Sequence, residues 1–251
     1  GAPDLQGVWD FRSLTPMERP EELADDESFS PEQAAEFAAE TIRQRSRDAD
    51  TSVRVVPYND FLSGAGPAGA TGPTALLVVP PGGLQVRCIL GFNSGPPMAP
   101  SAYNNNLQVF QTEDTVVLFA EMNHEARVVP LDGRAHLTDS VRQWTGDSRG
   151  RWDGDTLVVE TRNFLRETNF QRGATTPNLT LTERLTRVDA DTLRYDVTVD
   201  DPTVWTRPWT YSVPMQRNPQ PVYEYACHEG NYGLYNILAG AAVAGADDGS
   251  Q

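Results

Sequence analysis

The sequence contains no lysine: all 20 basic residues are arginines, set against 35 acidic residues. This absence excludes mechanisms that need a lysine amine, such as Schiff-base catalysis, pyridoxal-phosphate chemistry and the lysine of phosphate-binding loops. The formal net charge of −15 makes the surface repel nucleic acid and anionic membranes, so we expect neither as a partner. No apolar run approaches the roughly 20 residues that cross a bilayer.

Histidine and cysteine are almost as scarce, with three histidines and two cysteines in 251 residues. Cys88 and Cys227 form either one disulfide, as in an oxidising compartment, or two buried thiols. Neither His-Glu-x-x-His nor Cys-x-x-Cys occurs, which removes the main support for a zinc protease or a dithiol redox site. The chain starts Gly1-Ala2-Pro3 without a methionine, as signal-peptide removal would leave it, and we expect a periplasmic or secreted protein.

What the sequence does contain is a long series of strand-like runs, which predict a β core over residues 107–227. Turn signals such as Leu131-Asp132-Gly133-Arg134 separate several of them. The series favours a mainly β single domain over residues 1–251, built as an antiparallel up-and-down barrel or a strongly bent sheet. Gly7-Val8-Trp9 resembles the entry motif of lipocalins, and it favours a lipocalin- or calycin-like barrel.

Two helices are expected outside this core. Ser30 and Gln33 have the spacing of a capping box, which predicts a peripheral helix over residues 30–48. A second helix is predicted near the C-terminus, over residues 231–244. Residues 63–73 are rich in glycine, alanine and proline, and they predict a flexible loop.

A dense polar block at residues 121–152 lies between two apolar strands and holds two of the three histidines. Such a block is either a solvated loop region with ion pairs or the place where a β scaffold carries a site. A histidine can both accept and donate a proton near neutral pH. We therefore expect His124, and His228 after the last strand, to transfer protons, with Glu121 and Glu229 as their partners.

The expected substrate contacts are arginines for an anionic group and an aromatic wall. Alternation along residues 204–214 places three aromatic side chains and one arginine on one face, either lining a cavity or packing as an aromatic core. The predicted anion anchors are Arg127, Arg142 and Arg207, and the predicted wall is Trp205, Trp209 and Tyr211.

These residues predict an enzyme that acts on a small organic molecule by His/Glu acid–base chemistry without a cofactor, as a lyase, isomerase, cyclase or hydrolase. The alternative is a non-catalytic periplasmic carrier of a small aromatic or apolar ligand. A second alternative is a metalloenzyme whose coordination shell would combine His124, His136, His228 and Glu121.

Two long strings carry a resemblance to known sequences. GDSRGRWDGDTLVVETRNF (146–164) and YEYACHEGNYGLYNIL (223–238) resemble a family of exported bacterial hypothetical proteins. The resemblance extends over residues 107–240. It implies a secreted or periplasmic β-rich protein, and it implies no particular reaction.

Overall fold

The structure, a computed structural model, describes residues 1–13, 29–45, 84–85, 87–101, 103–168, 176–232, 235–236 and 239. The chain forms two compact units, one made of Gly1–Arg12 with Pro73–Gln251 and the other of Ser13–Gly72. The loop predicted at 63–73 and most of the helix predicted at 231–244 lie outside the described residues. The single domain expected over the whole chain stays a prediction.

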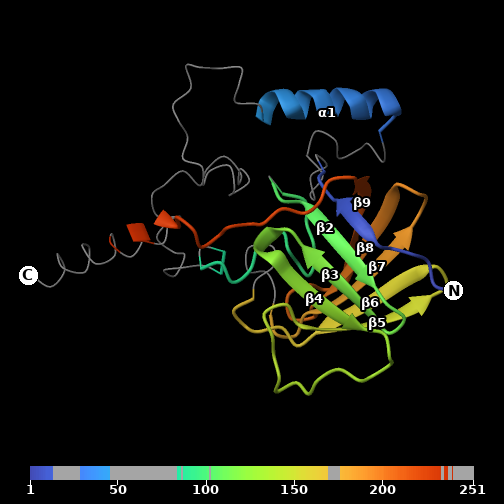
Figure 1. Cartoon of the computed structure of the whole chain (residues 1–251), viewed down its shortest axis with the longest axis vertical. Coiled ribbons are helices and arrows are strands. Elements are labelled where there is room, and N and C mark those ends of the chain that lie inside the picture. The colour runs from blue at the N-terminus through green and yellow to red at the C-terminus, as the bar shows by residue number, and fades with distance from the viewer. Residues whose placement is uncertain are drawn as a thin grey trace, which may run out of the picture. The chain divides into compact units, whose positions relative to one another are not determined.

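The larger unit is a sheet of nine antiparallel strands, so the prediction of a mainly β protein is confirmed (Figure 1). The order across the sheet is β4-β3-β2-β1-β9-β8-β7-β6-β5. Each strand pairs with its neighbours in the chain, except that β1 pairs with β9 and no ladder among the described residues joins β4 to β5. The strands are β1 (Gly7–Asp10), β2 (Asn106–Gln111), β3 (Thr115–Ala120), β4 (Glu125–Pro130), β5 (Asp147–Asp153), β6 (Thr156–Arg162), β7 (Thr180–Arg187), β8 (Thr192–Asp200) and β9 (Trp209–Asn218).

The sheet bends until its two edge strands approach each other without pairing. Arg127 on β4 reaches across to β7, where its Nη2 lies 2.8 Å from Glu183 Oε1. On β5, a Cβ atom added to Gly150 would lie 2.7 Å from Val129 Cγ1 and 2.5 Å from Leu131 Cδ2. Of the two expected architectures, the described residues therefore show the bent sheet, with its seam between β4 and β5 not closed into a barrel.

Replacing Gly150 by alanine should destabilise this seam by about 1–3 kcal/mol, because the new methyl group overlaps the side chains of Val129 and Leu131. Urea unfolding of the purified variant measures the loss. Val129→Ala in the same chain makes room for the methyl group. The double variant should therefore lose less stability than the two single variants lose together. Strictly additive losses would show that the two strands do not pack at this point.

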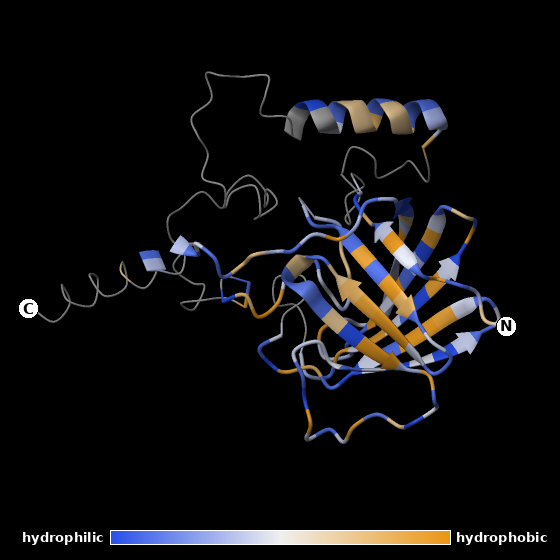
Figure 2. Ribbon diagram, in the orientation of Figure 1, coloured by the Kyte–Doolittle hydropathy of each residue, from blue (hydrophilic) through white to orange (hydrophobic). Residues whose placement is uncertain are grey.

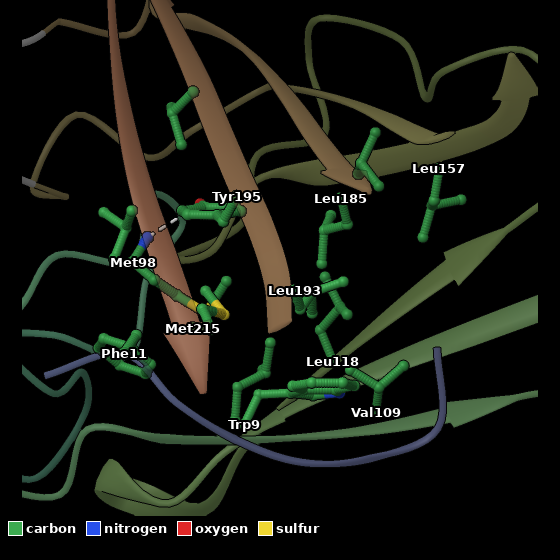
Figure 3. Packing of buried hydrophobic residues seen from close by; sticks show 14 of the residues in the cluster. Trp9, Phe11, Met98, Val109, Leu118, Leu157, Leu185, Leu193, Tyr195 and Met215 are labelled. Carbon is green, nitrogen blue, oxygen red and sulfur yellow. Dashed lines mark hydrogen bonds between the residues drawn. The ribbon is translucent and has the colours of Figure 1, made fainter. Parts of the chain in front are cut away.

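Apolar side chains fill one face of the sheet, and hydropathy alternates along the strands (Figures 2 and 3). On β8, alternate side chains from Leu193 to Val199 are fully buried, as their spacing predicts. Met98, from the irregular segment 91–105, enters the same core, and its backbone N–H donates to Tyr195 Oη at 3.1 Å. The described residues thus form a packed core on this face of the sheet.

The smaller unit contains α1 (Pro31–Arg45), which confirms the predicted helix up to residue 45, while its peripheral position stays a prediction. The capping box is also confirmed. Gln33 N–H donates to Ser30 Oγ at 3.2 Å, and Ser30 N–H donates to Gln33 Oε1 at 2.8 Å. No helix in the described ranges is long and apolar enough to span a membrane.

Two strand predictions are wrong. β9 begins at Trp209 and not at residue 204, because the chain turns over residues 201–208. In this turn the carboxylate of Asp201 accepts from Thr203 N–H, and its backbone carbonyl accepts from Trp205 N–H. Residues 221–227 form no strand, and Asp147–Asp153, for which no separate strand was predicted, is β5.

Candidate functional site

The polar block at 121–152 is divided among three places. Glu121 directly precedes the short 3₁₀ helix η3 (Met122–His124) after β3, and His124 is the last residue of that helix. Arg127 points into the core. His136 lies between acidic side chains of β5 and β6. The residues expected to work together are therefore distributed over separate environments.

Glu121 and His124 hold the backbone of the segment that follows β9. The carboxylate of Glu121 is buried and accepts from Asn106 Nδ2 at 2.7 Å and from Tyr223 N–H at 3.2 Å. His124 is exposed, and its Nε2 lies 2.9 Å from the carbonyl oxygen of Tyr225. Both side chains bind the chain's own backbone at two residues of the same C-terminal segment.

A disulfide fixes the same segment. It joins Cys88 to Cys227, with the Cα atoms 5.9 Å apart, so the two thiols are joined rather than free. His228 and Glu229 follow directly, and both are exposed. The described residues show no direct contact between His228 and His124, and their joint role in proton transfer stays a prediction.

The residues expected to hold a metal do not meet in the described part of the chain. There, no three histidine, cysteine, aspartate or glutamate side chains are grouped in a way that could hold a metal ion. Of the expected ligand set, His124 is bound to the C-terminal segment, His228 is exposed, and His136 contacts acids of β5 and β6.

Arg127 forms a buried ion pair with Glu183. Arg127 is 7% exposed and Glu183 is fully buried, and both nitrogens of the guanidinium fork bind the two carboxylate oxygens. Burial is the largest single influence and would lower the pKa of Arg127, but the charge of Glu183, its hydrogen bonds and the nearby Tyr195 and Glu125 together outweigh burial, so this pKa is raised. The anion that Arg127 was expected to anchor is thus supplied by the chain itself.

The buried ion pair continues into a hydrogen-bond network. Tyr195 Oη donates to Glu183 Oε1 at 2.6 Å and accepts from Met98 N–H, while Tyr211 Oη donates to the carbonyl of Met98 at 2.8 Å. Burial and the charge of Glu183 raise the pKa values of both tyrosines well above the usual range. Tyr211, expected in a ligand wall, therefore binds the backbone of Met98, whose side chain enters the core.

Two signals in the sequence were missed. One face of β7 consists of Leu181, Glu183 and Leu185, and all three are buried. Assigning a strand to this segment would therefore have been enough to place Glu183 on the buried face. Residues 146–150 spell Gly-x-Ser-x-Gly, a pattern of serine hydrolases. That pattern needs a strand-to-helix turn with an exposed serine, whereas Ser148 lies within β5, is 3% exposed and bonds Thr161 Oγ1 at 2.9 Å.

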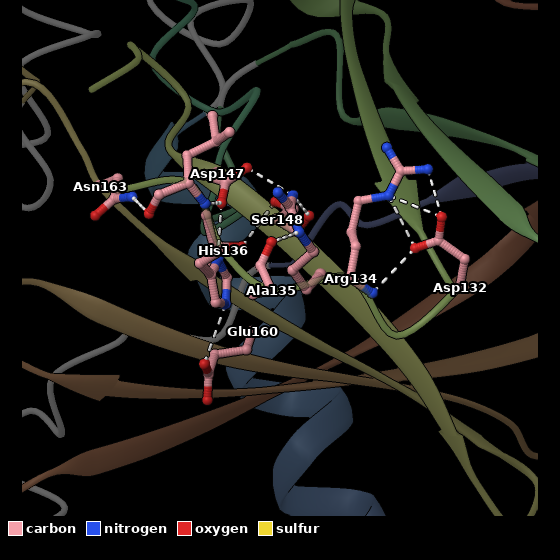
Figure 4. Close-up of polar contacts among 11 residues, drawn as sticks. Asp132, Arg134, Ala135, His136, Asp147, Ser148, Glu160 and Asn163 are labelled. Carbon is pink, nitrogen blue, oxygen red and sulfur yellow. Dashed lines mark hydrogen bonds and ion pairs between the residues drawn. The ribbon is translucent and has the colours of Figure 1, made fainter. Parts of the chain in front are cut away.

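His136 lies between two carboxylates (Figure 4). Its Nδ1 is 2.9 Å from Asp147 Oδ2, and its Nε2 is 3.2 Å from Glu160 Oε1. Strand alternation places these two acids on the face of the sheet opposite to Ser148 and Thr161. A neutral ring donates to only one of the carboxylates, and a protonated ring donates to both.

The two carboxylates differ in how firmly they are held. Asp147, whose side chain is 5% exposed, also accepts from Leu137 N–H at 2.9 Å and from Arg149 Nη1 at 2.6 Å. Glu160 is 33% exposed and pairs with Arg162 at 2.8 Å. His136 itself is 19% exposed. The cluster therefore has a fixed inner acid, a histidine and an outer acid that solvent reaches.

The remaining expected substrate contacts have structural partners or face solvent. Arg142 Nη1 donates to the carbonyls of Phe164 at 3.1 Å and Pro177 at 2.8 Å. Arg207 is exposed in the turn before β9. The predicted aromatic wall forms a half-buried cluster against the core, with ring centroids 5.6 Å apart for Trp205 and Trp209 and 5.9 Å apart for Trp209 and Tyr211.

Comparison with known proteins adds no relative: no family model matches the chain, and no curated protein or solved structure matches it.

Proposed function

We propose that the protein is an enzyme that converts a small organic molecule by acid–base catalysis, and that His136, rather than His124 or His228, is its proton-transfer histidine. The observation that carries the proposal is the pair of carboxylates on the two ring nitrogens of His136, one buried and one exposed. A carboxylate on Nδ1 orients an imidazole and stabilises the imidazolium that forms when the ring accepts a proton.

Each residue of the cluster has a role in this proposal. Glu160 is the most exposed of the three, so it contacts the substrate and removes the proton. The proton passes to Nε2 of His136, and Asp147 stabilises the resulting positive charge. Arg162, which pairs with Glu160, lies where it can meet negative charge that develops on the substrate.

Accessibility favours this cluster over the buried network. A catalytic group has to touch its substrate, and Glu183 and Tyr195 are completely buried beneath Met98. Solvent reaches His136 and Glu160 without any rearrangement of the core.

We further propose that the scaffold is an incompletely closed calycin-like barrel in an exported protein. The pairing of β1 with β9 supports this scaffold, as does Trp9, which lies beneath the guanidinium groups of Arg187 and Arg217 at 5.8 and 5.6 Å. Export is supported by the disulfide, a bond typical of oxidising compartments, and by the resemblance of two long strings to exported bacterial proteins. The partner in this proposal is a small organic molecule, because the net charge of −15 opposes binding to nucleic acid and anionic membranes.

Replacing His136 by glutamine should lower the rate of proton abstraction by about 10²–10⁴-fold, because the relay loses its proton acceptor. The probes are 5-nitrobenzisoxazole, whose ring opens when a base removes its C–H proton, and a panel of ketones and 2-hydroxy acids followed by deuterium exchange. Glu160→Gln should lower this rate by about the same factor as His136→Gln, since Glu160 and His136 act in the same proton relay.

His124→Gln and His228→Gln are the matched controls, and both should retain the wild-type rate. Thermal melting of each variant separates loss of activity from loss of fold. A His136→Gln protein that keeps its rate would overturn the assignment of the residue. A wild-type protein no faster than free imidazole on every probe would overturn the proposal of an enzyme.

A further inference from the structure

A surface hollow of about 430 Å³ lies where the N-terminal segment passes the end of β2. It is independent of the His136 cluster and shares no residue with it. Its only aromatic lining residue is Trp152 of β5, which is half-buried and packs against the core. The remaining lining residues are small or polar: Ala2, Asp4, Gln6, Gln111, Thr112 and Glu113.

Hydrogen bonds fix the wall of this hollow. Gln111 binds the N-terminal segment on both sides, accepting from Leu5 N–H at 3.0 Å and donating to the Pro3 carbonyl at 3.0 Å. Asp4 Oδ1 accepts from Gln6 N–H at 2.9 Å. The N-terminal segment is therefore held against the end of β2, and the hollow is part of the folded structure.

The charges around the hollow are unbalanced. Within the described ranges, neither Asp4 nor Glu113 forms an ion pair. Arg187 approaches Asp4, but it donates to the backbone carbonyl at 2.7 Å and uses its other nitrogens on the carbonyls of Asp189 and Ala190. Two carboxylates beside an indole ring thus lack a paired cationic side chain.

We propose that this hollow binds a small organic cation with an apolar body, a quaternary ammonium or amine. The face of an indole ring attracts such a cation, and desolvation of the cation's alkyl groups adds to the attraction. The carboxylates of Asp4 and Glu113 complement its charge, and the net charge of −15 raises the local concentration of cations. This inference concerns binding alone, so it stands or falls separately from the catalytic proposal.

The test is a titration of the whole protein with choline, followed by the indole N–H signals in nitrogen-15 NMR spectra, with Trp152→Phe used to assign the signal of Trp152. The Trp152 signal should shift saturably. The uncharged carbon isostere of choline, 3,3-dimethylbutan-1-ol, should bind much more weakly, because it lacks the charge that the carboxylates and the ring recognise. High salt should weaken choline binding.

Asp4→Asn and Glu113→Gln should each weaken choline binding by up to about fivefold, the range of an exposed charge pair. Asp155→Asn removes the same charge at an exposed position outside the hollow, and it should leave binding unchanged. The proposal is overturned by a non-saturating shift, by equal binding of the isostere, or by Asp4→Asn and Glu113→Gln variants that bind as the wild type does. Saturable binding of methyl glucoside in place of choline would show a polyol site instead.

Discussion

Replacing Arg127 by methionine is expected to lower the free energy of unfolding by about 3–5 kcal/mol, a larger loss than the methyl group of Gly150→Ala should cause. Methionine fills much the same volume, so the loss comes from charge and not from packing. The Glu183 carboxylate, fully buried, would keep its bond from Tyr195 but lose both bonds from the guanidinium. A buried anion without a counter-ion is far less stable than the same anion in water.

The double variant Arg127→Met/Glu183→Leu separates the two contributions. With both charges gone, the core contains only apolar groups at these positions, and most of the lost stability should return. The double variant should stay about 1–3 kcal/mol less stable than the wild type, because the buried Tyr195 hydroxyl loses its hydrogen-bond acceptor. Urea unfolding of the wild type, both single variants and the double variant completes the cycle.

Arg184→Met is the matched control, because Arg184 is adjacent to Glu183 on β7 but points to the other face. It pairs with Asp153 at 2.8 Å, with side chains 41% and 60% exposed, and its loss should leave the free energy of unfolding almost unchanged. A penalty as small as that of Arg184→Met would show that the Glu183 charge is not buried in solution.

The sequence was sufficient to predict most strands of the sheet, because strands with one buried face follow a period of two. Alternate burial from Leu193 to Val199 follows directly from that spacing. The same period assigns Arg127 and Glu183 to the buried face of their own strands. Their pairing could not be predicted, since they are 56 residues apart and meet only because the sheet bends β4 towards β7.

β5 was missed for a different physical reason. Its residues Asp147, Ser148, Arg149 and Gly150 have low strand propensity, and a polar strand forms here because it pairs with β6 along its whole length, with Ser148 bound to Thr161 across the ladder. Asp147 lies opposite Arg162, and Arg149 opposite Glu160, so opposite charges face each other across the ladder. Such pairs depend on which strand becomes the neighbour, which the local sequence does not specify.

The choice among the histidines was equally beyond local pattern. His124 stands next to Glu125 and close to Glu121 in the sequence, which made it the natural candidate. In the fold its ring binds a carbonyl, while His136, with no acidic residue beside it in the sequence, meets two carboxylates. Proximity along the chain does not reveal these contacts, because side chains of a strand and of the turn after it point in different directions.

Removing the Cys88–Cys227 disulfide is expected to lower stability by about 2–5 kcal/mol, because the bond closes a loop of 139 residues and restricts the unfolded chain. The variant Cys88→Ser/Cys227→Ser avoids a free thiol. In urea unfolding, this variant should have the same free energy of unfolding as reduced wild-type protein. A difference from oxidised wild type below about 1 kcal/mol would show that the unfolded chain gains little freedom from the loss of this bond.

The same variant shows whether the C-terminal segment depends on the disulfide or on its hydrogen bonds. Glu121 and His124 still bind this segment when the disulfide is gone. If these contacts are sufficient, the Tyr223 amide, which donates to Glu121, exchanges with solvent no faster than in the wild type. If the segment detaches, that amide exchanges faster while amides of the central strands stay protected. We expect detachment, because the bond from Tyr223 is 3.2 Å long and His124 is exposed, so water competes with both contacts.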